Sequence, residues 1–208
     1  MIKAQLSGPV FEFTGGRLCL DFANTVYGRP TKAPRDYMKS YGDLVSWARQ
    51  GGLIDVRDAD RLVRPLPAHP DAHTTLFGRA VALREAIYLT FSRLAAREDP
   101  RPDDIEILNQ ELAQAMMRPR IVRQGSTFLW AWDDPGGLDG RVLYPVVRSG
   151  AELLTSTEHG ALRECAADNC GWLFMDGSRN QSRRWCDMKT CGNRAKVRRY
   201  HERARTLT

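Results

Sequence analysis

The sequence predicts a mainly α-helical protein with a small β-hairpin, in which a helical N-terminal domain precedes a small cysteine-rich module. Three observations support this fold class. Apolar residues recur at three- and four-residue intervals over much of residues 1–160, as they do on the buried face of a helix. An alternating pattern, typical of strands, replaces this spacing at 120–132. Four of the five cysteines lie in the second module, at 161–208.

The first predicted element covers residues 10–28. Its apolar start, at 10–13, predicts a short strand, and a glycine pair then predicts a turn before a largely apolar run suited to a buried helix. Cys19 lies in this run without a partner cysteine and is expected to be a small core residue. Asp21 and Asn24 are polar residues in the same run. They either form hydrogen bonds within the core or line a pocket, and we favour the first because buried polar groups usually have partners.

Further helices complete the predicted N-terminal domain. Ser40 or Asp43 begins the first of them, and Asp55 begins the second. The longest has apolar residues at every third or fourth position, and acids begin the one after it, where the helix dipole favours negative charge. We expect these helices at about 43–50, 55–63, 71–96, 103–116 and 138–154, the last with a kink near Pro145.

A β-hairpin is expected between the last two helices. Residues 120–124 and 127–132 alternate around a Gly-Ser pair that supplies the turn. We expect Ile121, Phe128 and Trp130 to occupy packing positions on this hairpin.

The positive charge is concentrated at the C-terminal end. The net charge is +6, from 31 basic and 25 acidic residues. From Arg163 onward there are 11 lysines and arginines against 5 acids, so residues 1–162 are neutral. A neutral body with a basic end indicates an anionic partner for that end.

The four C-terminal cysteines form two close pairs. Four residues separate Cys165 from Cys170 and Cys186 from Cys191, and fifteen lie between the pairs. This spacing fits a tetrahedral Zn²⁺ site in which each tight turn supplies two sulfurs. Two disulfides or four unrelated thiols are the alternatives. Because the N-terminus lacks a signal-peptide pattern and no apolar run reaches the roughly 18 residues of a membrane span, we expect a cytoplasmic chain with reduced thiols and no membrane partner.

The predicted zinc is structural. A catalytic zinc keeps a position open for water and usually has His or Glu among three protein ligands. Four thiolates close the shell, and the only histidine of this segment, His201, lies ten residues beyond the last cysteine. Zinc binding contributes on the order of 10–16 kcal/mol in finger peptides, which would stabilise a module too short to bury much core.

The cysteine-rich module resembles the CGNR zinc finger. The resemblance lies in Trp185–Met188, in Cys191–Lys196, which begins with the four residues of the family name, in the turn at Cys170–Trp172 and in the segments 176–180 and 183–185. It implies a treble-clef-like finger in which the four cysteines bind zinc and the module binds DNA. Residues 15–26, GGRLCLDFANTV, resemble the start of the ABATE domain, which often precedes a CGNR finger. This second resemblance implies a bacterial stress-induced transcription regulator.

A basic helix is expected from Asn193 onward. Val197, Tyr200 and Ala204 share one face at about 100° per residue, and we expect this stripe to pack against the zinc turn or the body. Basic rows on both sides suit a helix that meets phosphates or enters a major groove. The candidate DNA contacts, including those of the preceding loop, are Arg179, Arg183, Arg184, Arg194, Lys196, Arg198, Arg199, Arg203 and Arg205.

Some residues of the finger admit two interpretations. Arg194 lies in the first helical turn, where it either contacts a base or braces the zinc loop. Trp172, Phe174 and Trp185 are expected to form a small core rather than base-stacking platforms, because so small a module needs its aromatic residues inside.

The sequence therefore predicts a zinc-dependent transcriptional regulator that binds double-stranded DNA. The domain at 1–160 would sense a signal, through an unknown small-molecule effector, or mediate assembly. Since a single finger rarely gives useful specificity, we expect a homodimer through that domain. The alternatives are an RNA-binding module, a finger that docks a protein, and small-molecule sensing near Asp21 and Asn24. No HExxH, GxSxG or P-loop pattern is present, so we do not predict an enzyme.

Overall fold

The computed structural model describes residues 8–64, 71–117, 119–132 and 139–206, with the backbone alone for 139–141 and 202–206. Within these ranges the chain is mostly helical and has small antiparallel sheets of two strands each. A cluster of four cysteines lies near the C-terminal end. The predicted fold class is confirmed.

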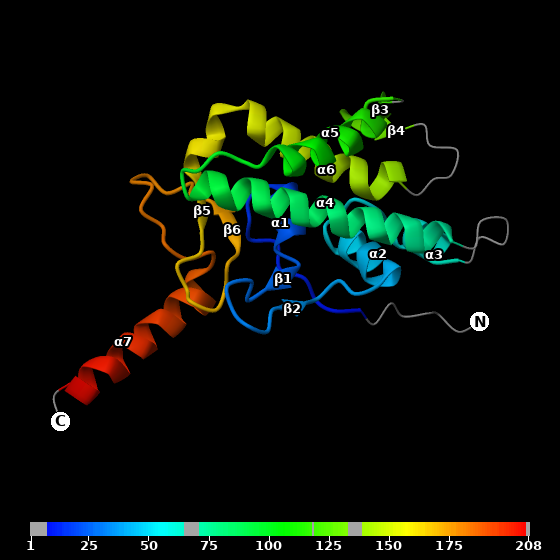
Figure 1. The fold of residues 1–208 in the computed structure, drawn as a ribbon. Coiled ribbons are helices and arrows are strands. Elements are labelled where there is room, and N and C mark those ends of the chain that lie inside the picture. The colour runs from blue at the N-terminus through cyan, green and yellow to red at the C-terminus, as the bar shows by residue number, and fades with distance from the viewer. Residues whose placement is uncertain (1–7, 65–70, 118, 133–138, 207–208) are drawn as a thin grey trace.

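The long helices and the expected β-hairpin lie where the helical and alternating patterns predict them. The helices are α1 (Leu18–Ala23), α2 (Tyr41–Gln50), α3 (Val56–Leu62), α4 (Ala72–Ala95), α5 (Pro102–Ala115), α6 (Asp139–Thr155) and α7 (Asn193–Thr206), with short helical turns η1 (Thr157–Ala161) and η2 (Met188–Gly192). The strand pairs are β1 (Val26–Tyr27) with β2 (Arg35–Asp36), β3 (Pro119–Gln124) with β4 (Thr127–Trp132), and β5 (Leu162–Glu164) with β6 (Leu173–Met175). The β1–β2 and β5–β6 pairs were not predicted. Helices α1 to α6 gather into one body, from which α7 projects (Figure 1).

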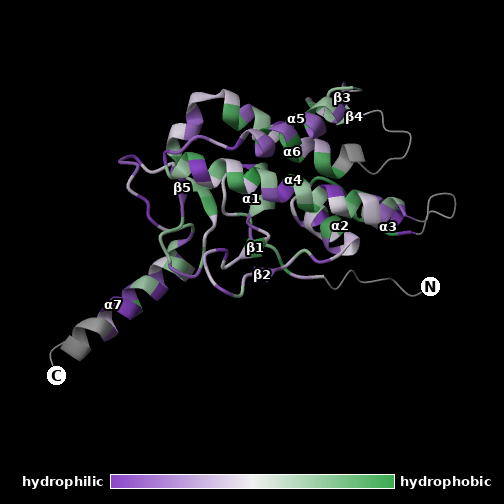
Figure 2. Cartoon of the chain, in the orientation of Figure 1, coloured by the Kyte–Doolittle hydropathy of each residue, from purple (hydrophilic) through white to green (hydrophobic). Residues whose placement is uncertain are grey.

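The main core lies where α1 packs between α4 and α6. Cys19 and Phe22 of α1 have no exposed surface, and the Phe22 ring lies 4.9 Å from the ring of Trp47 on α2. Burial of one large apolar side chain contributes about 1.5–3 kcal/mol, so this cluster is a principal source of stability. Figure 2 shows hydrophobic residues along the body helices and a largely hydrophilic α7.

The helix starts follow from short polar side chains. The Ser40 hydroxyl accepts a hydrogen bond from the Asp43 N–H at 3.2 Å, and the Asp55 carboxylate accepts one from the Asp58 N–H at 2.8 Å. In α5 the structure differs from the simple cap, because Arg101 is the N-cap residue and makes no side-chain cap bond. The acids in its first turn, Asp103 and Asp104, therefore act on the helix dipole instead.

Two local expectations are wrong. Residues 10–13 form no strand, because the Phe11 N–H donates to the Gln50 side chain at 3.0 Å, in place of a strand partner. In the β3–β4 hairpin the expected packing residues are instead exposed: Ile121 to 69%, Phe128 to 68% and Trp130 to 46%.

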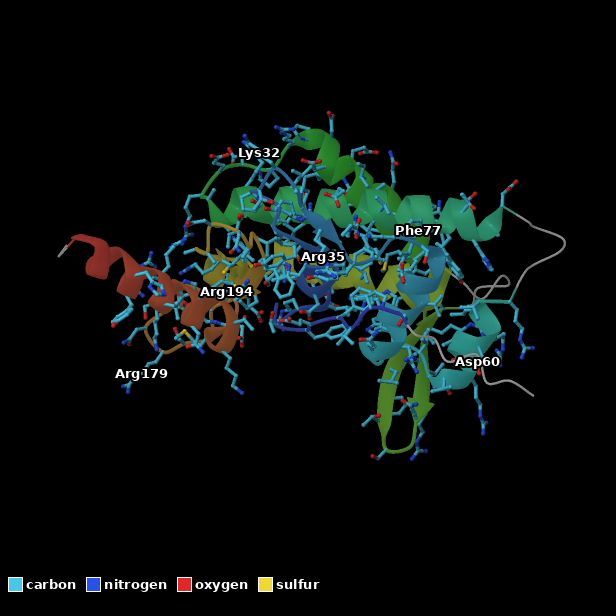
Figure 3. The ribbon with its side chains drawn as sticks, turned by 90° about the horizontal axis from the view of Figure 1, so that it is seen from below. Lys32, Arg35, Asp60, Phe77, Arg179 and Arg194 are labelled. Carbon is cyan, nitrogen blue, oxygen red and sulfur yellow. The ribbon has the colours of Figure 1, made fainter. Side chains whose placement is uncertain are left out.

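The hairpin is attached to the body mainly at its base. The Trp132 ring N–H donates to the Ala115 carbonyl at 2.6 Å, and the same ring lies 6.0 Å from that of Tyr144. Beyond this point the hairpin extends away from the body, on a side remote from α7 (Figure 3). The alternation predicted the strands, but α6 covers only part of β4: the Arg148 guanidinium lies 5.2 Å over the Trp130 ring, whereas Ile121 and Phe128 remain exposed.

The cysteine-rich module is joined to the body by hydrogen bonds. The Asn24 side chain donates to the Leu173 carbonyl at 2.8 Å and accepts from the Leu173 N–H at 2.9 Å. The Gly28 N–H donates to the Cys170 carbonyl at 2.8 Å. Leu162 and Leu173 also belong to the main core. These contacts fix the cysteine-rich turns against α1 and the strand that follows it.

Candidate metal centre and nucleic-acid interface

Four thiols converge at the end of the module. Cys165, Cys170, Cys186 and Cys191 are buried, and their sulfur atoms all lie within 4.8 Å of one another. The Cys170–Cys186 and Cys186–Cys191 sulfur distances are both 3.7 Å. A tetrahedron of sulfurs about 2.3 Å from a zinc ion has edges of about 3.8 Å, so the arrangement fits zinc. The cysteines form no disulfide, whose sulfurs would lie about 2.05 Å apart.

The four thiols lie close enough to share protons. Hydrogen bonds from the Cys170 and Cys186 thiols lower the pKa of the Cys165 thiol well below its ordinary value, and the same contacts raise the pKa values of Cys170 and Cys186. Because thiolate is the metal-binding species, zinc binding would release the protons that Cys170 and Cys186 retain.

Two tight turns position the cysteines. At the first, Gly171 adopts a φ of +75°, and a Cβ at this position would lie 2.8 Å from the Pro30 ring, so both conformation and space require glycine. At the second, the Asp187 carboxylate accepts hydrogen bonds from the Thr190 N–H at 2.7 Å and the Thr190 hydroxyl at 3.0 Å. This cap begins η2, which contains Cys191 and continues directly into α7.

Asp176 organises the loop between the cysteine pairs. This buried carboxylate accepts hydrogen bonds from the Ser178 N–H at 3.0 Å, the Ser178 hydroxyl at 2.6 Å and the Arg183 N–H at 2.9 Å. Burial acts against ionisation, but these donors together lower the pKa of Asp176. The loop is thereby held in one conformation. The sequence indicated the loop but not the role of this carboxylate.

The three aromatic residues near the cysteines pack inside the finger. Trp172 and Phe174 are buried with the cysteines, and Trp185 packs partly buried beside them. The Trp172 ring N–H donates to the Val26 carbonyl at 3.1 Å. Trp172 therefore also joins the finger to the body.

The candidate DNA-binding residues fall into three groups. Arg183 and Arg194 form hydrogen bonds with the cysteine-bearing turns. The side chains of Arg203 and Arg205 lie outside the described residues. The others are exposed: Arg179, Arg184, Lys196, Arg198 and Arg199.

Arg183 and Arg194 brace the zinc turns. The Arg183 guanidinium donates to the Trp185 carbonyl at 2.9 Å and lies 4.5 Å over the Phe174 ring. Arg194 donates to the Tyr27 hydroxyl at 2.8 Å and to the Cys191 sulfur at 3.4 Å. The sequence analysis did not identify Tyr27 as a partner of Arg194, because the two residues lie 167 positions apart. Its own pKa is raised by burial.

Helix α7 is exposed along its described length. Val197 is 56% exposed and Tyr200 is 71% exposed, so the expectation that this stripe packs on the zinc turn or the body is wrong. The physical reason is the direction of the helix, which leaves η2 and points away from the body (Figure 1). Arg198 forms an ion pair with Asp168, and both side chains remain at least half exposed.

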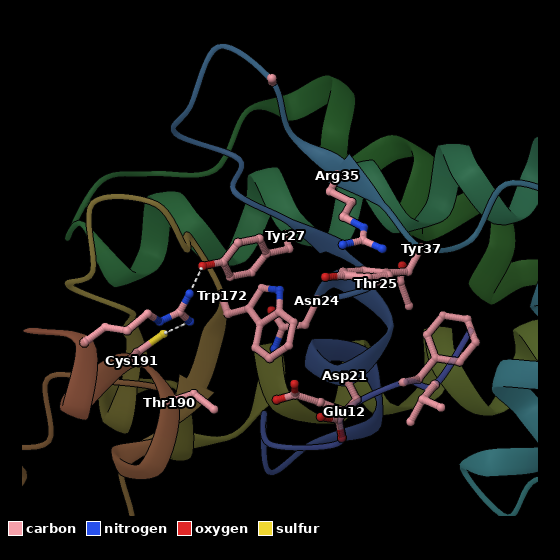
Figure 4. A pocket seen from close by; sticks show the side chains of 14 residues that line it. Glu12, Asp21, Asn24, Thr25, Tyr27, Arg35, Tyr37, Trp172, Thr190 and Cys191 are labelled. Atoms are coloured by element: carbon pink, nitrogen blue, oxygen red, sulfur yellow. Dashed lines mark hydrogen bonds between the residues drawn. The ribbon is translucent and has the colours of Figure 1, made fainter.

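A cavity of about 530 Å³ lies at the junction of body and finger. Asp21 and Asn24 both line it, and both also form hydrogen bonds, with the Gly15 N–H donating to Asp21 at 2.7 Å. The two interpretations of these residues are therefore compatible. Burial raises the pKa of Asp21 to about 6. Figure 4 shows the cavity with Cys191 at its finger side, and Arg194, which donates to the Cys191 sulfur, also lines it.

No helix in the described part of the chain is long and apolar enough to cross a membrane. Residues 16–157 match the ABATE family, described as a putative stress-induced transcription regulator, and residues 161–204 match the CGNR zinc finger. A comparison with curated proteins gave no match. The four buried cysteines of the CGNR finger identify Zn²⁺ as the cofactor. The chain belongs to the ABATE family, and it carries a CGNR zinc finger.

Proposed function

We propose that the protein is a zinc-dependent transcription regulator that binds double-stranded DNA through α7. The observation that carries this proposal is the exposed helix itself. It begins two residues after Cys191, projects from the body, and carries six lysines and arginines against one acid, whereas residues 1–162 have no net charge. An isolated α-helix fits the major groove of B-DNA, whose phosphates attract lysines and arginines.

The exposed stripe of α7 suits the floor of the groove. Val197 and Tyr200 lie between a row that contains Arg198 and a row that contains Lys196 and Arg199. If the rows contact phosphates on the two sides of the groove, the stripe faces base edges, where an apolar side chain can contact a thymine methyl group. Contact with DNA would therefore explain why Val197 and Tyr200 are exposed and not packed against the protein.

The remaining candidates divide between contact and support. Arg179 and Arg184 are exposed on the finger and would add phosphate contacts. The Arg198–Asp168 pair is a surface ion pair, worth roughly 0–1 kcal/mol, so a phosphate can compete for Arg198. For Arg194 the hydrogen bonds to Tyr27 and Cys191 favour the bracing role over base contact.

Zinc, held by the four cysteines, would set the direction of α7. The ion supplies no reaction in this proposal; it ties two turns together. Since Cys191 lies within η2 and η2 continues into α7, a ligand bond at this residue fixes the first turn of the basic helix.

We also propose that the protein dimerises through the β3–β4 hairpin. Strand β4 has no charged residue, whereas β3 contains Arg120 and Arg123. An uncharged outer edge is open to pairing with another strand, and two copies of β4 can pair antiparallel across a two-fold axis. Pairing through β3 would bring arginines together, so β4 is the favoured edge.

A binding-site selection tests the DNA proposal. The zinc-loaded full chain, its metal content measured, is used to enrich binders from random duplexes, and the enriched duplex is compared with single-stranded RNA at matched salt. We expect one enriched duplex sequence and weaker RNA binding. Preference for the RNA would favour an RNA-binding module. Absence of nucleic-acid binding by the zinc-loaded protein would favour a finger that docks a protein partner.

A further inference from the structure

The junction cavity is enclosed by residues of both parts of the chain. Tyr27 and Arg35 of the β1–β2 sheet line it from the body, and Trp172 and Arg194 line it from the finger. Its volume, about 530 Å³, lies in the range of pockets that hold small organic molecules. The DNA-binding proposal assigns no role to this space.

Part of the lining serves as a rigid frame. Asn24 uses its side chain on both backbone groups of Leu173, and the Trp172 ring N–H is bonded to the Val26 carbonyl. Thr25 donates its hydroxyl to the Phe22 carbonyl at 2.8 Å. These polar groups already have protein partners. They therefore define the shape of the cavity and its apolar surface, and they do not form hydrogen bonds with a ligand.

Opposite charges remain on the two sides of the cavity. Glu12 and Asp21 lie together on one side, and Arg35 enters from β2 on the other (Figure 4). Among the described residues Glu12 forms no ion pair, and Arg35 lies 4.8 Å over the Tyr37 ring without an acidic partner. Two carboxylates would bind an amino group, and a guanidinium is suited to a carboxylate.

We propose that this cavity binds a small zwitterion with a flat apolar body, its amino group on Glu12 and Asp21 and its carboxylate on Arg35. Trp172 and Tyr27, whose rings lie edge to face at 5.9 Å, form an aromatic wall for the apolar part. An aromatic amino acid has the size, charges and shape that these groups require.

Occupancy of the cavity would act on the base of α7. Tyr27 lines the cavity and accepts the hydrogen bond from Arg194, which also donates to Cys191. A ligand against Tyr27 and Arg194 therefore stabilises the arrangement in which the first turn of α7 is fixed to the body. This consequence rests on the proposed function. If DNA binds the arrangement in which α7 is fixed, the bound ligand should raise the affinity for DNA, and bound DNA should raise the affinity for the ligand by the same factor.

Matched probes test the ligand assignment. L-Tryptophan, tryptamine and 3-indolepropionate share one ring system and differ in the amino and carboxylate groups. Calorimetric titration of the zinc-loaded full chain is expected to give L-tryptophan an affinity at least about tenfold above either partial probe, since each lacks one charge-assisted contact. L-Phenylalanine and L-tyrosine, each with the corresponding amine and acid, extend the test to other rings.

Variants assign each end of the ligand. Arg35→Gln is expected to abolish the preference for L-tryptophan over tryptamine, and Glu12→Gln is expected to reduce its preference over 3-indolepropionate. Arg57→Gln, at an exposed position of α3 outside the cavity lining, is the control and should leave both preferences intact. Thermal unfolding of all three variants verifies that each is folded.

The outcomes separate this proposal from the DNA proposal. The ligand assignment is overturned if no amino acid of the set binds, or if each set of matched probes binds alike and Arg35→Gln changes nothing. Anisotropy titrations of the selected duplex, with and without the bound amino acid, then test the coupling. Ligand binding without DNA binding would contradict only the proposed function, and DNA binding without ligand binding would contradict only the present inference.

Discussion

Asp21 is a buried carboxylate whose protonation state bears on stability. It is 8% exposed, and burial raises its pKa from 3.8 to about 6. The folded protein therefore holds this proton more tightly than the unfolded chain. Between about pH 4 and pH 6 the contribution of Asp21 to folding becomes less favourable as pH rises, and it stays at that lower level above pH 6.

Asp21→Asn should remove this dependence. The amide oxygen can still accept the Gly15 hydrogen bond, so at pH 7.5 we expect the free energy of unfolding to rise by about 1–3 kcal/mol. Urea denaturation at several pH values gives the difference between variant and parent, which should shrink toward pH 4.5. Asp60→Asn, at an exposed position of α3, is the control. A difference that does not vary with pH would contradict the assignment.

The Asn24 side chain forms hydrogen bonds with both the N–H and the carbonyl of Leu173, 149 positions away in the sequence. Asn24→Ala leaves the N–H and the carbonyl of buried Leu173 without partners, and we expect a loss of about 2–4 kcal/mol in the free energy of unfolding. Asn24→Asp retains the acceptor for the N–H but, once ionised, sets a buried carboxylate oxygen against the Leu173 carbonyl, so its loss should grow as pH rises. Urea denaturation of the zinc-loaded variants at several pH values measures both, and an Asp variant whose loss does not change with pH would argue against the paired contact.

At the scale of single elements, the proposed DNA contact of α7 should determine the salt dependence of binding. About six phosphate contacts give a slope near −5 for log affinity against log salt. Replacing Arg198 and Arg199 together by alanine should weaken binding to all duplexes and make the slope less steep by about 2. Arg57 and Arg64, exposed on and after α3, provide a control that removes the same charge from the body. A double alanine variant of α7 with an unchanged slope would remove this helix from the interface.

Zinc should determine whether α7 keeps its position. Cys170→Ser is expected to lower bound zinc and, at limiting metal, to abolish DNA binding, because the turns that begin the helix lose a ligand. Cys19→Ala changes a cysteine outside the cluster and should retain full zinc content. Metal analysis and anisotropy titration of the same samples measure both effects, and a zinc-free variant that still binds DNA would contradict the role of the ion.

Sequence patterns predicted the local features of these elements but not their contacts with the rest of the protein. The helix starts at Ser40 and Asp55 depend on residues close in sequence, and so does each pair of zinc-binding cysteines. These features could therefore be predicted from the sequence alone. The exposure of Val197 and Phe128 was not, because periodicity indicates which residues share a face but not whether another element covers it. The Arg194–Tyr27 contact required the fold, since no local pattern brings these residues together.

At the scale of the whole molecule, the hairpin and α7 extend in different directions from one body (Figure 3). If two copies join through β4, light scattering should give twice the mass of one chain. Phe128→Glu and Leu129→Glu together should yield a monomer that binds the selected duplex more weakly, because paired fingers no longer act together. Val56→Glu, at an exposed position of α3, is the control. A parent chain that is monomeric both with and without DNA would contradict the dimer.

The seam between body and finger constrains how this regulator can be re-engineered. Leu162 and Leu173 lie in the central hydrophobic cluster, and Asn24 of the ABATE part completes the backbone bonding of β6. A finger fused alone to another protein would expose Leu162 and Leu173 to solvent, and the backbone groups of Leu173 would lose their hydrogen bonds to Asn24. A chimaeric protein that includes the finger and α7 would therefore also have to include α1 and Asn24.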